Sequence, residues 1–232
     1  MKKISLLLIL LATSVLANAQ KKDLEPFTAI KVFGGFQIEL IPSDKEAIEM
    51  EAFNIDKEDL HVEVHRGLLE LKIKNRHYLT DWDSDKFRKS LRIKTKIYYK
   101  VLDEIDASAG AIVRCGETLS NKKMVIMSAM GAEVTVMTVS EILYAKVSMG
   151  GIAYLNGRTD FLEVKASMGG ELKANHLESK TAIVKASMGS MVDIYASEEI
   201  DIDAGMGAEV RYSGEPTVRH TSTRMGADIR KR

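Results

Sequence analysis

Hydrophobic and polar side chains alternate along residues 108–232, and the alternation returns in steps of about nineteen residues. Each step centres on a glycine, usually preceded by methionine, and successive glycines lie 21, 19, 19, 20, 18 and 19 residues apart. The series consists of Gly110, Gly131, Gly150, Gly169, Gly189, Gly207 and Gly226. A period this regular is typical of repeat architectures, in which each unit packs on its neighbours.

Aligning the copies on their glycines separates inward from outward positions. The residues three and five before the glycine are small or apolar, whereas the residue between them is mostly polar. After the glycine, an apolar column lies at the third position, in Val134, Ala153, Leu172, Val192, Val210 and Ile229. Alternation with a period of two predicts strands with one buried face on both sides of each glycine turn. The region is therefore expected to be all-β.

Two strands per unit fit either an antiparallel meander or a coil. In a coil each unit lies directly on the previous one, so equivalent side chains form stacks about 4.8 Å apart. Small residues and methionines that return at fixed positions favour the coil. Because parallel crossovers are almost always right-handed, the sequence predicts a right-handed parallel β-solenoid over residues 108–232.

Residues 20–107 are predicted to form a less regular, β-rich N-terminal part. Alternating segments at 61–64 and 69–74 indicate strands joined by a turn at Arg66-Gly67. The alternation breaks over about residues 75–90, which predicts an irregular loop, and it resumes before the first glycine of the repeat.

The first 19 residues have the layout of a secretory signal peptide. Lys2 and Lys3 precede an apolar run from Ile4 to Leu11, and small residues follow at Ala17-Asn18-Ala19. We therefore expect an exported protein in the periplasm, at the cell surface or outside the cell. No other stretch approaches the length of a membrane-spanning helix, so no transmembrane segment is expected in the mature chain.

Charge and cysteine content exclude several kinds of site. The chain has 33 Lys plus Arg against 33 Asp plus Glu, without the basic excess typical of nucleic-acid-binding proteins. Cys115 is the one cysteine, and we interpret it as a small buried residue rather than a nucleophile. On one strand, His61 and His65 would lie roughly 13 Å apart, too far to share a metal ion. No cofactor or metal site is predicted.

The irregular loop is the predicted binding site. It contains Tyr78, Trp82 and Phe87, aromatic side chains of the kind that stack on sugars or anchor a protein partner. The alternative is that these aromatics pack over the open N-terminal end of the solenoid. The expected partner is a glycan or a cell-surface protein.

An acidic stretch within the same loop begins like a calcium site. Asp81, Asp83 and Asp85 place carboxylates at alternate positions, as a hard cation requires. An EF-hand loop would continue with a glycine and, at its twelfth position, a glutamate, but Lys86 and Arg92 occupy those places. A solvated acidic loop is therefore expected, with calcium as the weaker candidate.

Charged residues at equivalent repeat positions predict rows along the solenoid. A basic row comprises Lys146, Lys165 and Lys185, and an acidic row comprises Glu133, Glu171, Glu209 and Asp228. Like charges stacked at about 4.8 Å repel one another, although salt and solvent screen exposed rows. Each row is interpreted either as an ordinary solvated face or as a binding strip for a polymer of opposite charge.

The methionines of the Met-Gly pairs form a column of their own. Strand parity places each side chain inward, where an unbranched thioether fills a gap at a bend. A thioether ladder for copper ions is the alternative, and it would need exposed sulfurs that converge on one point. The residues concerned are Met130, Met149, Met168, Met188, Met206 and Met225.

From about residue 25 to 230 the chain resembles the secreted bacterial proteins described as putative auto-transporter adhesins, head GIN domain. The resemblance rests on the order of short motifs, namely 27–32 with Gly34-Gly35, 67–73, 102–105 before Ser108-Ala109-Gly110, the repeated glycine turns, and 212–216. It implies an all-β, solenoid-like protein outside the cytoplasm, typical of Bacteroidota, with no assigned enzyme activity. Ser-Met-Gly turns replace the usual Ser-Gly-Ser-Gly turns of that family.

These observations together predict a β-solenoid that binds, adheres or scaffolds, without catalysis. The alternative is a carbohydrate-active enzyme similar to polysaccharide lyases, because parallel β-helices also host that activity. Such an enzyme needs a cleft in which carboxylates converge beside a basic residue that accepts a proton.

Overall fold

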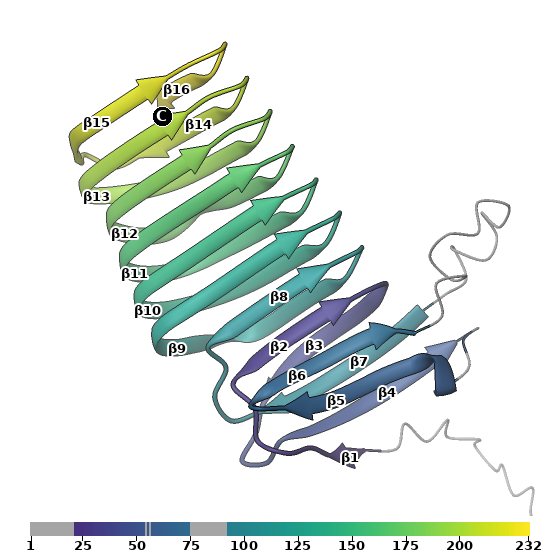
Figure 1. Ribbon diagram of the computed structural model, residues 1–232. Helices are drawn as coiled ribbons and strands as arrows, with labels where there is room; N and C mark the ends of the chain where they lie inside the picture. Colours follow the sequence, from purple (N-terminus) through teal and green to yellow (C-terminus); the bar gives the residue numbers. More distant parts are fainter. Residues whose placement is uncertain (1–20, 54, 56, 75–91) are drawn as a thin grey trace, which may run out of the picture.

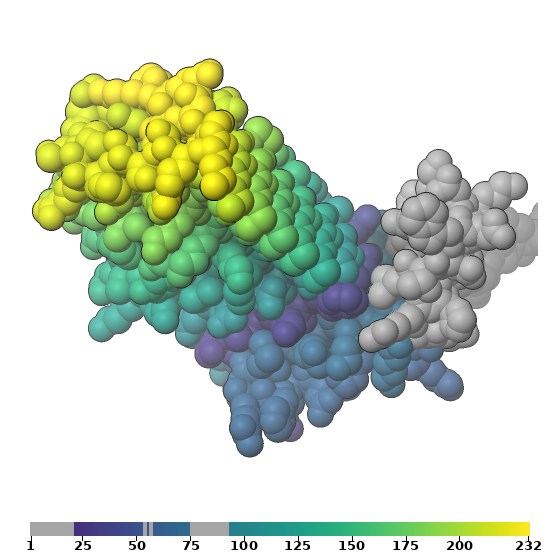
Figure 2. All heavy atoms as spheres, turned by 45° about the horizontal axis from the view of Figure 1, so that its top comes forward, coloured from purple at the N-terminus to yellow at the C-terminus, as the bar shows by residue number. Residues whose placement is uncertain are grey.

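The computed structural model describes residues 21–53, 55, 57–74 and 92–232, and strands dominate these segments. The expected signal peptide and the irregular loop lie outside the described residues. The strands coil into a flattened stack, whose axis runs from the N-terminal part to the C-terminal part of the chain (Figure 1). In the space-filling view the coils follow one another without a break (Figure 2). The predicted parallel β-solenoid is confirmed.

Sixteen strands and one short 3-10 helix make up the described chain. The N-terminal elements are β1 (Lys22–Asp23), β2 (Ala29–Phe33), β3 (Phe36–Pro42), β4 (Ala47–Phe53), η1 (Lys57–Asp59), β5 (Leu60–His65), β6 (Leu68–Ile73) and β7 (Arg92–Tyr99). The stack continues with β8 (Glu104–Ser108), β9 (Ile112–Ala129), β10 (Glu133–Ser148), β11 (Ile152–Ser167), β12 (Glu171–Ala186) and β13 (Met191–Ala204). It ends with β14 (Glu209–Ser213), β15 (Thr217–Thr223) and β16 (Asp228–Lys231).

Each long strand contributes to two faces of the stack. At the C-terminal end, β14 pairs with residues 191–195 of β13, whereas β15 pairs with residues 199–204. At the N-terminal end, β3 pairs with the first part of β9 and β8 with its last part. We name the side formed by β8, the second halves of β9–β13 and β15 the lysine face. The side formed by the first halves, β14 and β16 is the opposite face.

The inward columns of both faces fill the core. Residues three and five before the glycine are at most 3% exposed in the first five coils. The apolar column after the glycine is equally buried, from Val134 to Val210. In the last coil the equivalent residues Thr221, Thr223 and Ile229 are partly or fully exposed, because no further coil covers them.

Parallel stacking also extends below residue 108. Strand β2 lies between β6 and β8, and β3 lies between β7 and β9, all in parallel register. Strands β2 and β3 are therefore inserted between β6–β7 and β8–β9, whereas β1 pairs with β4 at the outer edge of the sheet. Antiparallel strands β4 and β5 follow outside β7 and β6.

The tight turns between coils carry two successive residues with positive φ. Each methionine has φ between 49° and 52°, and the glycine after it has φ between 67° and 74°. A hydrogen bond closes each turn, for example from the Gly151 N–H to the Ser148 carbonyl at 2.9 Å. These are the features of a type I′ turn, in which glycine, asparagine and aspartate are the favoured residues.

The predicted inward position of the methionines is wrong. Their side chains are 42% to 53% exposed in the first five turns and 77% exposed in the last, at Met225. Parity holds only while the backbone is extended, and the left-handed conformation at each methionine turns its side chain away from the core. We name this row of Met130, Met149, Met168, Met188, Met206 and Met225 the methionine edge.

The broad bend at the other side of each coil is held by hydroxyl groups. The Thr138 hydroxyl donates to the Leu119 carbonyl at 3.1 Å, and the Ser140 hydroxyl donates to Thr159 Oγ1 at 3.1 Å. Both threonines are fully buried. These bonds satisfy polar groups where the strands bend, since an unpaired buried polar group is costly.

Candidate binding groove

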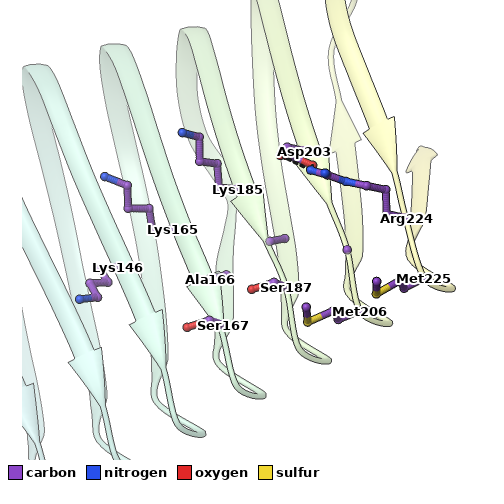
Figure 3. Close-up of a pocket in the computed structure, with 12 residues that line it drawn as sticks. Lys146, Lys165, Ala166, Ser167, Lys185, Ser187, Asp203, Met206, Arg224 and Met225 are labelled. Carbon is purple, nitrogen blue, oxygen red and sulfur yellow. Dashed lines mark hydrogen bonds and ion pairs between the residues drawn. The ribbon is translucent and has the colours of Figure 1, made fainter.

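The three lysines of the predicted basic row lie on directly paired positions of neighbouring strands. Lys146 pairs in register with Lys165, and Lys165 with Lys185. The row continues from Met127 before Lys146 to Asp203 after Lys185. Figure 3 shows the lysine side chains standing side by side on successive strands.

The lysine row has little internal compensation for its charge. Lys165 lies 2.7 Å from Glu163 Oε1, and this hydrogen bond raises the pKa of the lysine. Within the described part of the chain, no carboxylate oxygen lies within 4.0 Å of the ammonium groups of Lys146 and Lys185. Two cations therefore remain available to an external anion.

A groove of about 500 Å³ runs beside these lysines on the lysine face. Small residues that precede the Met-Gly pairs form part of its lining, together with two members of the methionine edge. The residues concerned are Ser167, Ser187, Gly205, Met206 and Met225. Because the groove crosses several coils, it suits an extended ligand that lies along the stack.

An ion pair closes the C-terminal end of the groove. Arg224 Nη2 lies 2.8 Å from both carboxylate oxygens of Asp203, which stands next to Lys185 in the row. The hydrogen bond from Arg224 lowers the pKa of Asp203, so its carboxylate is ionised at neutral pH. Asp203 offsets part of the positive charge at this end, and its carboxylate holds the Arg224 guanidinium at the groove.

The predicted acidic row is found on the opposite face, but apolar residues interrupt it. Glu133 pairs with Ile152, which pairs with Glu171, and Met191 separates Glu171 from Glu209. Each carboxylate also has a cation beside it: the pairs are Arg114–Glu133, Lys173–Glu171, Arg211–Glu209 and Arg230–Asp228. The acidic row is therefore largely neutralised within the chain, in contrast to the lysine row.

A second groove of about 640 Å³ lies on the N-terminal strands and was not anticipated from the sequence. Its lining combines three carboxylates with three cations, in Glu39, Glu49, Glu51, Lys94, Lys96 and Arg114. Tyr98 donates a hydrogen bond to Glu49 Oε1 at 3.1 Å, and Arg114 already pairs with Glu133. The alternation of β3, β4, β7 and β9 places these groups outward, but only the pairing of the four strands brings them together.

The remaining sequence-based candidates fall into two groups. Tyr78, Trp82 and Phe87 lie outside the described residues, as do Asp81, Asp83 and Asp85. Among the described residues, no cluster of histidine, cysteine, aspartate or glutamate could hold a metal ion.

His61 and Cys115, which were not expected to form a metal site or a nucleophile, contact neighbouring side chains. His61 Nε2 lies 3.3 Å from Glu63 and 3.5 Å from Glu70. Cys115 is buried as predicted, and its sulfur lies 3.4 Å from the Tyr99 hydroxyl. Burial and this contact raise the pKa of Tyr99, so its phenol is neutral.

Solved structures share this fold. A putative adhesin from Bacteroides fragilis is 18% identical, with 92% of this chain and 95% of that chain covered and a TM-score of 0.77. A putative lipid binding protein from Parabacteroides distasonis is 16% identical over the same shares, with a TM-score of 0.66. A putative adhesin from Parabacteroides merdae is 15% identical, again over 92% and 95%, with a TM-score of 0.60.

Sequence comparison identifies the family. No curated protein matches the sequence significantly. In the described segments, no helix has the length and apolar character that crossing a membrane requires. Residues 26–216 match the family described as putative auto-transporter adhesin, head GIN domain, whose name suggests an extracellular or surface location. This match covers most of the sequence, and the chain belongs to that family.

Proposed function

We propose that this protein is an exported binding protein that holds an extended anionic glycan along the lysine row. The observation that carries the proposal is the direct stacking of Lys146, Lys165 and Lys185, two of them without a carboxylate partner among the described residues. Neighbouring like charges cost stability unless a counter-charge compensates them. An anionic polymer along the stack supplies that compensation.

Several features agree with this proposal. The groove is open and crosses several coils, so it can follow a chain of sugar residues rather than enclose a small molecule. The family name and two of the structural neighbours refer to adhesins, which act by binding. The signal-peptide layout of residues 1–19 supports export to the compartment in which surface glycans occur.

The test measures binding of residues 20–232 to an array of acidic and neutral glycans. The variant Lys146→Gln, Lys165→Gln, Lys185→Gln is expected to lose roughly tenfold or more in affinity for acidic glycans, because it removes three cations from one line. A matched control replaces Lys22, Lys45 and Lys100 with glutamine, which removes the same charge from exposed sites elsewhere. Equal loss in both variants would reduce the effect to net charge and reject the lysine row as the site.

The irregular loop predicted over about residues 75–90 is a second proposed contact with the glycan. Tyr78, Trp82 and Phe87 are the side chains that would stack on sugar rings. Their contribution is independent of charge, so it is expected for neutral and acidic glycans alike.

The second groove supports a carbohydrate-active enzyme as the alternative function. Glu39, Glu51 and Lys96 line one cavity, which is the combination of carboxylates and base that proton abstraction requires. The test is incubation with acidic polysaccharides, followed by detection of unsaturated products. Product formation that disappears in Lys96→Ala would establish the enzyme, and intact polysaccharide after prolonged incubation would reject it.

A further inference from the structure

The methionine edge does not serve the folding of the turns. Ala109 occupies the equivalent turn position before Gly110, with φ of 56°, so the same turn forms without a thioether. A residue with a side chain is strained in this conformation, and asparagine or glycine would fit better. The five methionines from Met130 to Met206 leave 42% to 53% of their surface exposed. The burial of their side chains therefore offsets only part of the backbone strain.

The side chains of the methionine edge form a straight row. Each turn is bonded to the next, from the glycine N–H to the carbonyl of the following methionine, at 2.9 to 3.2 Å. The side chains consequently leave the backbone about 4.8 Å apart along one line. Figure 1 shows the turns of successive coils forming a single edge of the stack. A straight row of exposed side chains can contact a plane with all its members at once.

The two flanks of the edge differ in charge. On the opposite face, Glu133 and Glu171 lie near the turns but are paired with Arg114 and Lys173, at 2.8 and 3.1 Å. On the lysine face, Lys146 and Lys185 lie at the corresponding distance along the chain and have no carboxylate partner among the described residues. The edge therefore combines apolar tips with one cationic flank.

We propose that the methionine edge docks on the surface of an anionic lipid bilayer. Flexible thioethers adapt to an irregular apolar environment and would enter the boundary between headgroups and acyl chains. The lysine row beside them would face the negatively charged headgroups, where each basic residue adds to the attraction. This inference rests on the proposed anion-binding role of the lysine row and adds an apolar contact that a hydrated glycan does not need.

The experiment measures co-sedimentation with phosphatidylcholine vesicles that contain or lack phosphatidylglycerol. The variant Met149→Asn, Met168→Asn, Met188→Asn places a favoured residue in each turn, so it keeps the fold while removing three apolar side chains. The wild-type protein is expected to bind the anionic vesicles, and the variant to partition roughly tenfold less. Circular dichroism and thermal melting of the variant verify that its solenoid is intact.

A matched control removes exposed apolar surface away from the edge. Met137 and Val139 are 45% and 39% exposed near the broad bend, and Met137→Thr with Val139→Thr is expected to bind vesicles as the wild type does. Equal partition of the wild type and the asparagine variant would overturn the proposal. So would absence of wild-type binding to anionic vesicles, or binding that does not depend on phosphatidylglycerol.

The two proposals fail separately. If the lysine variant keeps its affinity for acidic glycans while the asparagine variant loses vesicle binding, the glycan proposal falls and bilayer docking stands. If the lysine variant loses glycan binding while the asparagine variant keeps vesicle binding, the methionine edge is rejected and the glycan groove stands.

Discussion

Arg211 donates two hydrogen bonds to the carboxylate of Asp193 in the preceding coil, from Nε to Oδ1 at 2.5 Å and from Nη2 to Oδ2 at 2.9 Å. Asp193 is only 7% exposed, and Arg232 adds a third contact at 3.2 Å. The pair connects β13 to β14 and brings the chain terminus back onto the same carboxylate. It stabilises the coils that have the fewest neighbours.

Removing Arg211 should therefore loosen the C-terminal coils. We expect Arg211→Ala to lower the free energy of unfolding by about 2 kcal/mol, since Asp193 keeps only its contact with Arg232 while it remains buried. Urea unfolding followed by circular dichroism measures the change. Arg230→Ala serves as the control, because its pair with Asp228 is exposed and should contribute no more than about 0.5 kcal/mol. Equal effects of the two substitutions would contradict this role of Asp193.

A single substitution on the methionine edge should stabilise the protein. Met168 has φ of 49° and is 46% exposed, so asparagine in its place would relieve backbone strain and lose little packing. We expect Met168→Asn to raise the free energy of unfolding by about 0.5 to 1 kcal/mol. The comparison is Met124→Asn, which removes a fully buried side chain and should be strongly destabilising. A lower melting temperature for Met168→Asn would show that the thioether is needed by the fold.

The stability of the protein should depend on the ionisation of Asp106. Burial raises the pKa of this half-buried carboxyl, and the neighbouring Lys31 and Lys146 only partly oppose the effect. The folded protein therefore holds this proton more tightly than the unfolded chain does. Consequently, the stability associated with Asp106 is fully present below the ordinary pKa of 3.8 and is lost as the pH rises through the folded value.

Asp106→Asn tests that sign. The variant is expected to be more stable than the wild type at neutral pH, where the buried charge is unfavourable, and the difference should disappear at acidic pH. Thermal melting of both proteins across a pH series provides the measurement. A variant that is less stable at neutral pH would mean that the attraction of Lys31 and Lys146 exceeds the cost of burial.

Neutralising the carboxylate in the groove should strengthen anion binding. Asp203 engages Arg224 at 2.8 Å and stands beside Lys185. In Asp203→Asn the guanidinium is released and the negative charge is gone, so affinity for acidic glycans should rise roughly threefold, with a steeper dependence on salt. Titration by isothermal calorimetry at two salt concentrations measures both quantities. Weaker binding would show that Arg224 needs Asp203 to be held in position.

Replacing the one tryptophan tests the loop that was predicted from the sequence. Trp82→Ala is expected to weaken binding to neutral and acidic glycans by about 1 to 3 kcal/mol, the range for truncation of a contacting aromatic side chain. A glycan array with the wild type and Trp82→Ala side by side provides the measurement. Unchanged binding would remove the loop from the proposed site.

The register of the solenoid followed from the sequence because each coil repeats nearly the same number of residues. The sequence alone predicts that Lys146, Lys165 and Lys185 form one row, since equal steps return a residue to the same place in the next coil. The buried columns were predictable for the same reason. Alternation is a local property of extended backbone, and it survives wherever the backbone stays extended.

Only the tertiary structure decided the direction of the methionines, the order of the first strands and the shape of the groove. Two successive residues with positive φ reverse the parity on which the inward assignment of Met149 depended, and a turn conformation is not contained in a hydrophobic pattern. The insertion of β2 between β6 and β8 depends on pairing between segments far apart in the chain. Likewise, the pair between Asp203 and Arg224 forms because coiling places a residue next to another 21 positions away.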